Sequence, residues 1–155
     1  MKKTLAFLGA LALAVTPSST ISGHLPRQES QIKPGGDLSH NNLNNADLQG
    51  VNLYGANMRD ANLRGANLSN AKLVDADLRG TDLTSSNLRD ANLRGSNISS
   101  ANLSDANLLG ADLRFANLTA ANMSDANLSE VNFSSANLTA ANLSNANLSD
   151  ANFSD

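Results

Sequence analysis

Large apolar residues recur at every fifth position from Leu38 to Phe153, without an insertion or a deletion. The residue two positions before each of them is small, most often Ala, and the residue between is Asn or Asp in 23 of the 24 units, with Lys72 as the exception. The two residues that complete each unit are mostly Ser, Arg, Gly, Asp or Asn. An internal repeat of this regularity determines the architecture before any single motif is considered.

Neither a regular helix nor a straight strand fits a period of five. Residues five apart on an α-helix are rotated by about 140°, so the leucines would spiral around the axis and form no stripe. Side chains of a straight strand alternate with a period of two, so successive leucines would point to opposite faces. The pattern therefore predicts a short extended piece followed by a corner in every unit, with the small and large residues inside and the Asn or Asp outside.

This pattern resembles the pentapeptide-repeat family, whose unit is Ala-(Asp/Asn)-Leu-x-x and is legible in the segment Ala61-Asn62-Leu63-Arg64-Gly65. The resemblance implies an all-β fold, a right-handed quadrilateral β-helix with four units per coil, so that the 24 repeats make about six coils. Residues twenty apart would then lie above one another. On this basis we expect Phe133 and Phe153 to stack, and the outward Asn residues to form ladders between coils. The Asn-x-Ser/Thr triplets, which would also fit glycan attachment, follow from the repeat itself.

The N-terminal segment has a different composition. Lys2 and Lys3 precede an apolar run over residues 5–15 and then a short polar stretch, which is the order of a secretory signal peptide. The run is too short to span a bilayer as a stable helix. We expect residues 1–22 to be a signal peptide, 23–35 a linker or N-terminal cap, and 36–155 the β-helix domain. The alternative for the apolar run is a helix that caps the β-helix. The resemblance to signal-bearing family members implies export to the periplasm or the thylakoid lumen, with no membrane contact after signal removal.

The composition offers little material for catalysis. The sequence has no Cys, no Trp and two histidines, His24 and His40, which lie far from any second pair of metal ligands. Stacked carboxylates such as Asp105 and Asp125 would lie about 5 Å apart, a spacing that suits a retaining glycosidase, but a flat outward surface provides no sugar cleft. The sequence therefore predicts a protein that is no enzyme and that has no cofactor and no metal site.

Charge is the outward feature that carries a pattern, within a formal net charge of -3. The arginines follow central residues in the middle of the repeat, and only acidic charges remain beyond Arg114. In a twenty-residue register Arg59 lies over Arg79, and Arg94 lies over Arg114 on the adjacent face. These four arginines form a candidate surface for an anionic partner. The alternative is solubility charge, because aspartates are interspersed among them.

Two functions are consistent with these expectations. The preferred one is a non-catalytic structural or interaction protein, an exported rigid rod that presents flat faces to an unidentified protein partner and binds no nucleic acid. The alternative, implied by the resemblance, is the gyrase-binding DNA mimicry of some pentapeptide-repeat proteins. Mimicry requires regular negative charge along the rod. This chain instead places arginines across its middle, and the predicted signal peptide would remove it from the cytoplasm.

The last coil of the repeat is followed by no polar cap in the sequence. We expect Leu138, Leu143, Leu148 and Phe153 to be exposed at this end of the rod. Terminal repeats of a solenoid normally need a polar outer face for solubility. A two-fold contact between two copies would cover these side chains and close the assembly. The sequence therefore predicts a homodimer through the C-terminal coil.

Overall fold

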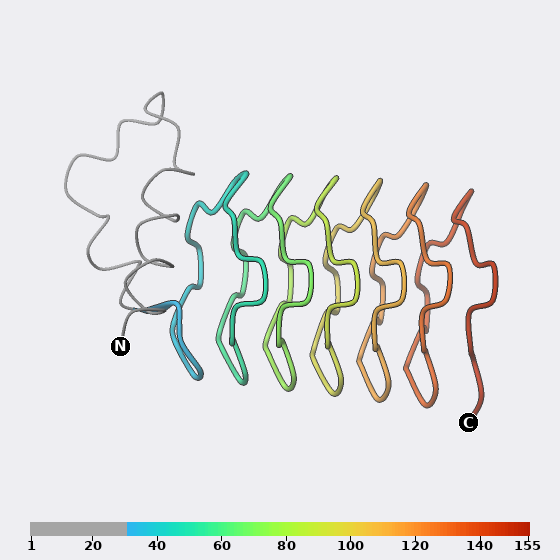
Figure 1. Ribbon diagram of the computed structural model, residues 1–155. Helices are drawn as coiled ribbons and strands as arrows, with labels where there is room; N and C mark the ends of the chain where they lie inside the picture. The colour runs from blue at the N-terminus through green and yellow to red at the C-terminus, as the bar shows by residue number, and fades with distance from the viewer. Residues whose placement is uncertain (1–30) are drawn as a thin grey trace.

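The computed structural model describes residues 31–155, which wind into a stack of similar turns that lie side by side from one end to the other (Figure 1). The extended part of each unit is a single β-bridge residue, and no longer strand forms in the described part of the chain. Every bridge is parallel and joins residues twenty positions apart, as in Asn57↔Asp77. Four columns of bridges therefore run along the stack, and the fold is a four-sided β-helix.

Two of these four faces carry the candidate interaction residues, and each is named after its first bridge residue. The Asp37 face has the bridge residues Asp37, Asn57, Asp77, Asn97, Asn117 and Asn137. The Asn52 face has the bridge residues Asn52, Lys72, Asn92, Asp112, Asn132 and Asn152. The two faces are neighbours, because the chain passes from one to the next within five residues.

Two kinds of backbone hydrogen bond hold each unit in place. Between coils, the Leu63 N–H donates to the Asp82 carbonyl at 2.7 Å, and the Asn62 N–H donates to the Asn41 carbonyl at 2.9 Å. Within the unit, the Ala66 N–H donates to the Leu63 carbonyl at 2.9 Å and closes a tight turn. The fifth residue of each unit, which is the third residue of the turn, has a positive φ, as in a type II turn. This conformation favours Gly, Asn and Asp, which explains why they are frequent at the fifth position.

The interior is filled by two side chains from each unit. The central leucines, such as Leu63 and Leu88, are completely buried, and so are the small residues that alternate with them. Large and small side chains thus interdigitate at the density of a normal protein interior. Hydroxyl groups at the small position bond to the backbone: Thr81 Oγ1 donates to the Leu78 carbonyl at 2.6 Å, and Ser86 Oγ donates in the same way. No buried polar side-chain atom within residues 31–155 lacks a partner.

The N-terminal end of the stack is partly covered. Ile32 packs against the core, and the Gly35 N–H donates to the Tyr54 carbonyl at 2.8 Å. The predicted signal peptide, residues 1–22, and residues 23–30 of the predicted linker lie outside the described residues. Over residues 31–155, the structure has no helix with the length and apolar character that a membrane crossing requires.

The C-terminal end presents residues that are buried elsewhere in the stack. Leu138, Leu143 and Leu148 are only half-buried, and Phe153 is 48% exposed. The rings of Phe133 and Phe153 stack with their centroids 5.0 Å apart and 9° between their planes, which confirms the contact predicted from their spacing. The last coil of the structure thus ends in a small apolar face.

We expect the register of the repeat, more than any single side chain, to determine folding. Deletion of Ser104 shifts every later unit by one residue and turns the following leucines outward unless a bulge absorbs the change. Deletion of residues 76–95 removes one whole coil and should leave a shorter folded rod, because each coil contacts only its neighbours. Thermal unfolding followed by circular dichroism compares the two variants. Equal loss of structure in both would contradict the importance of register.

Candidate interaction surface

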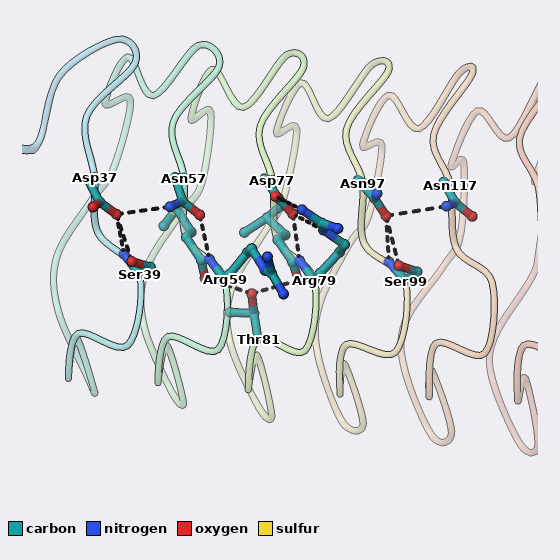
Figure 2. Close-up of polar contacts among 12 residues, drawn as sticks. Asp37, Ser39, Asn57, Arg59, Asp77, Arg79, Thr81, Asn97, Ser99 and Asn117 are labelled. Atoms are coloured by element: carbon teal, nitrogen blue, oxygen red, sulfur yellow. Dashed lines mark hydrogen bonds and ion pairs between the residues drawn. The ribbon is translucent and has the colours of Figure 1, made fainter.

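Most of the outer surface is a ladder of Asn and Asp side chains whose polar atoms bond to the protein itself. Asn67 Oδ1 accepts the Ser69 N–H at 3.2 Å, the Ser69 hydroxyl at 2.8 Å and the Asn87 amide group at 3.2 Å. Figure 2 shows similar contacts between coils along the Asp37 face, and the predicted Asn ladders are confirmed. Because the ladder uses its polar groups internally, it offers few free hydrogen-bonding groups to a partner.

The four arginines of the predicted surface divide into two kinds. Arg79 turns toward the carboxylate two residues earlier, with Nε 2.7 Å from Asp77 Oδ1, and Figure 2 shows this pair on the Asp37 face. Arg114 pairs with Asp112 in the same way, at 2.8 Å and 2.7 Å. Arg59 and Arg94 are exposed and form no ion pair within residues 31–155. Half of the predicted cationic surface is therefore neutralised locally.

The two ion pairs shift the pKa values of their members. The side-chain hydrogen bond from Arg79 holds the pKa of Asp77 below its usual value, against the opposing effect of partial burial. The hydrogen bond from Arg114 lowers the pKa of Asp112 for the same reason, and the charge of Arg94 adds to this effect. The arginine pKa values are raised in return. Both pairs thus stay charged at all pH values near neutrality.

Of the other titratable residues considered in the sequence, His24 lies outside the described residues, and His40, Asp105 and Asp125 are exposed. His40 Nδ1 lies 3.9 Å from Asp60 Oδ2, and both side chains are exposed. Asp105 and Asp125 are exposed corner residues, and Asp125 Oδ1 accepts a hydrogen bond from the Asn145 amide at 3.1 Å. No cluster of three His, Cys, Asp or Glu that could hold a metal ion occurs in the described part of the chain.

The Asn52 face carries three apolar side chains that the sequence analysis did not identify, Tyr54, Val74 and Phe115, beside the predicted Arg94. Tyr54 and Phe115 are 52% and 56% exposed, although they are large and apolar. Val74 and Arg94 lie between them along the stack, and the Arg94 guanidinium lies 5.3 Å from the centre of the Phe115 ring. Tyr54, Val74 and Arg94 are twenty residues apart, so their alignment could have been found from the repeat. The contact between Arg94 and Phe115, which lies at the corner, could not have been found from the repeat.

Two shallow depressions lie along these side chains. The first has a volume of about 410 Å³, and its lining includes Tyr54, Lys72 and Val74. The second has a volume of about 400 Å³, and its lining includes Val74, Arg94 and Phe115. Both depressions border Val74, so they lie next to each other on the Asn52 face, the first toward Asp90 and the second toward Phe115. We call this set of residues, Tyr54, Lys72, Val74, Arg94 and Phe115, the aromatic–cationic band.

Comparison with known proteins agrees with this architecture. The sequence profile of the family described as "Pentapeptide repeats" matches residues 34–60, 61–99, 96–134 and 116–155, in eight copies. A search of curated proteins gives no significant match. The four-sided stack and the profile together define a β-helical solenoid, and the chain belongs to the pentapeptide-repeat family.

Several solved structures are similar to the chain. HetL, a pentapeptide-repeat protein involved in heterocyst differentiation regulation in the cyanobacterium Nostoc sp. strain PCC 7120, is 30% identical with a TM-score of 0.51, and the match covers 79% of this chain and 76% of HetL. Rfr23 of the cyanobacterium Cyanothece 51142 is 28% identical with a TM-score of 0.51, covering 84% and 97%. QnrB1, a plasmid-mediated fluoroquinolone resistance protein, is 21% identical with a TM-score of 0.52, covering 77% and 73%, and at this identity the likeness concerns the fold alone.

We expect the Asp77 and Asp112 ion pairs to contribute to stability against acid. Because the folded pKa of each carboxylate is depressed, its contribution is complete above the unfolded value of about 3.9 and is lost as the pH falls through the folded value. As the pH falls from 5 to 2, the melting temperature of the double variant Asp77→Asn with Asp112→Asn should therefore decrease less than that of the parent. A matched control is Asp105→Asn with Asp150→Asn, which changes exposed carboxylates outside these pairs. Parallel acid curves for the parent and the Asp77/Asp112 variant would contradict the expectation.

Proposed function

We propose that this protein is a non-catalytic interaction protein, an exported rigid β-helical rod that holds a protein partner against one of its flat faces. The rod is proposed to be a right-handed helix with 24 units in about six coils. One observation carries the proposed function: the ladder uses its polar groups internally, whereas a few aromatic and cationic side chains project from it, and these cations have no carboxylate partner in the described residues. Such side chains are the kind that dominate binding at protein interfaces.

The arginine-bearing faces are the part of the rod that we propose to contact the partner. Arg59 and Arg94 are available to an anionic group, because neither has a carboxylate partner in the described structure. Arg79 and Arg114 each bind an aspartate of their own unit and are exposed only in part. We assign them a structural role beside the two free cations. A cofactor or a metal ion has no part in this proposal.

DNA mimicry is the second candidate function, and it has less support. The likeness to QnrB1 concerns the fold alone, because the two sequences are 21% identical. A mimic of the phosphate backbone needs closely spaced negative charge. The outward ladder of this rod is mainly neutral Asn, and its middle carries Arg59, Arg64, Lys72 and Arg94 at exposed positions. We therefore favour a protein partner other than gyrase.

Export is proposed from the sequence, since residues 1–22 lie outside the described part of the chain. Two lysines followed by a short apolar run are typical of a secretory signal. We propose that the mature protein begins between Ser18 and Pro26 and resides in the periplasm or the thylakoid lumen. It would then meet its partner outside the cytoplasm.

We also propose that two copies of the rod associate through the C-terminal coil. Leu138, Leu143, Leu148 and Phe153 form the apolar end that a two-fold contact would cover. One cross-section of the rod is small compared with a standard interface, so the affinity is expected to be modest. Light scattering of the mature protein should show a dimer, and Phe153→Glu should shift it to a monomer because a charge would be buried. Ser154→Glu adds the same charge beside this end as a control. A dimer that Phe153→Glu leaves intact would rule out this contact.

Crosslinking in the native cells tests the main proposal. The protein is expressed with a photoreactive residue at Val74, and the crosslinked products are identified by mass spectrometry after cell fractionation. We expect one defined protein to be captured, and an intact mass that corresponds to a start between Ser18 and Pro26. A matched control with the same residue at Ser134 lies in the same column, two coils beyond Arg94. Full-length protein that keeps Met1 in the cytoplasm would reverse the localisation, and capture of gyrase would establish the alternative function.

A further inference from the structure

The ladder of the Asn52 face is interrupted where the aromatic–cationic band begins. Side-chain amide hydrogen bonds between coils recur on the other faces, as from Asn122 to Asn102 at 3.0 Å. On the Asn52 face, Lys72 occupies the position of an Asn. Within the described residues, the amide hydrogen bond between Asn side chains occurs on this face only at the C-terminal end, from Asn152 to Asn132. The fold does not require Lys72, because every other unit has Asn or Asp at this position. An exposed Lys at this position therefore points to a role outside the rod.

Phe115 is a second exception that folding does not explain. Its backbone has a φ of 60°, in the left-handed region where a bulky residue is strained. The side chain gains little from burial, since it is 56% exposed and its main contact is the Arg94 guanidinium. Gly95 precedes it in the same corner column, and the Asp75 carboxylate lies against Gly95. Strain at an exposed aromatic side chain is typical of a binding position.

The charges of the band favour a negatively charged occupant. Lys72 and Arg94 form no ion pair within residues 31–155. Two nearby carboxylates are already paired, Asp112 with Arg114 and Asp90 with Arg89. Asp75 is a further exposed carboxylate at the same corner. The free charge of the band is therefore positive on balance, in a chain whose total charge is -3.

The size of the band limits the class of occupant. It extends over the coils that contain Tyr54, Val74, Arg94 and Phe115, which are spaced by about 4.8 Å, so its length is roughly 15–20 Å. An area of this length and of similar width is roughly 225–400 Å², at most half of the ~800 Å² that each partner buries in a standard interface. An extended peptide covers 15–20 Å with about five or six residues. The band thus fits a short segment of a partner better than a second copy of the rod.

We propose that the aromatic–cationic band binds a short extended segment of the partner protein that contains both carboxylate and aromatic side chains. Lys72 and Arg94 bind the carboxylates, while Tyr54, Val74 and Phe115 contact the aromatic and aliphatic side chains. Arg94 takes part in both contacts, because it already stacks on the Phe115 ring. This assignment rests on the proposed function, since it names the surface and the chemistry by which the rod holds its partner.

Fluorescence anisotropy with three labelled peptides tests the assignment directly. The first contains the sequence Phe-Asp-Leu-Asp-Phe, the second replaces both Asp with Lys, and the third replaces the apolar residues with Ser. We expect the first peptide to bind the mature protein at least about tenfold more tightly than either of the others. Equal affinity for all three, or no binding of the first at a concentration of about 1 mM, would overturn the proposal.

Variants of the rod locate the binding. Lys72→Glu with Arg94→Glu should weaken binding of the acidic peptide by at least about tenfold, and Tyr54→Ser with Phe115→Gly should do the same. Arg64→Glu with Ser104→Glu and Ser144→Glu changes the charge by the same amount in one column of another face, outside the proposed partner surface, and should leave binding within about twofold. An equal loss in this control would show that net charge alone attracts the peptide, and the assignment to the band would fall.

Lys72→Asn separates binding from folding. This variant supplies the amide group that the ladder lacks on the Asn52 face, so its melting temperature should be equal to or above that of the parent. Peptide binding should nevertheless weaken several-fold, because one of the two cations is lost. If binding is unchanged, Lys72 has no part in recognition. Capture of a native partner that depends on Arg59 and not on the band would leave the proposed function in place and overturn this inference alone.

Discussion

The whole molecule depends on one constraint, which is that each group of five residues turns the chain through one corner and returns it to the same register after twenty residues. The constraint is met by hydrogen bonds between coils, such as that from Leu63 N to Asp82 O, together with a positive φ at the fifth residue. If either failed, the leucines would no longer meet inside. Burial of a central Leu contributes about 1.5–3 kcal/mol, so the same register also supplies most of the stability.

This constraint determines what kind of surface the protein can have. Four flat faces carry side chains at fixed spacings, and Asn side chains such as Asn67 bond to their own turn and to the next coil. In a surface of this kind most polar side chains already have hydrogen-bond partners in the rod. Recognition must therefore depend on side chains that depart from the repeat. The aromatic–cationic band on the Asn52 face is the largest group of such departures, and it includes a strained Phe115.

The comparison of the two arginine faces shows why sequence spacing alone does not define a charged surface. Arg79 and Arg114 each have an aspartate two residues earlier, and the bidentate contact neutralises them and lowers the pKa of that carboxylate. Arg59 follows Asn57, and Arg94 follows Asn92, so neither has this partner. The column of Arg59 and Arg79 therefore contains one free and one paired arginine, and so does the column of Arg94 and Arg114. A partner that needs two cations would find them in Lys72 and Arg94, on one face.

The sequence by itself determined the period, the inward and outward positions and the stacking of Phe133 on Phe153, because these follow from local geometry repeated without interruption. It also contained the signal for aligning Tyr54, Val74 and Arg94, which are twenty residues apart. The sequence also distinguishes Arg79 and Arg114, which follow an aspartate by two residues, from Arg59 and Arg94, which follow an asparagine. Only the tertiary structure decided that the ring of Phe115 meets Arg94 at a corner. This contact depends on side-chain rotamers and on the packing of neighbouring coils, and no five-residue pattern encodes it.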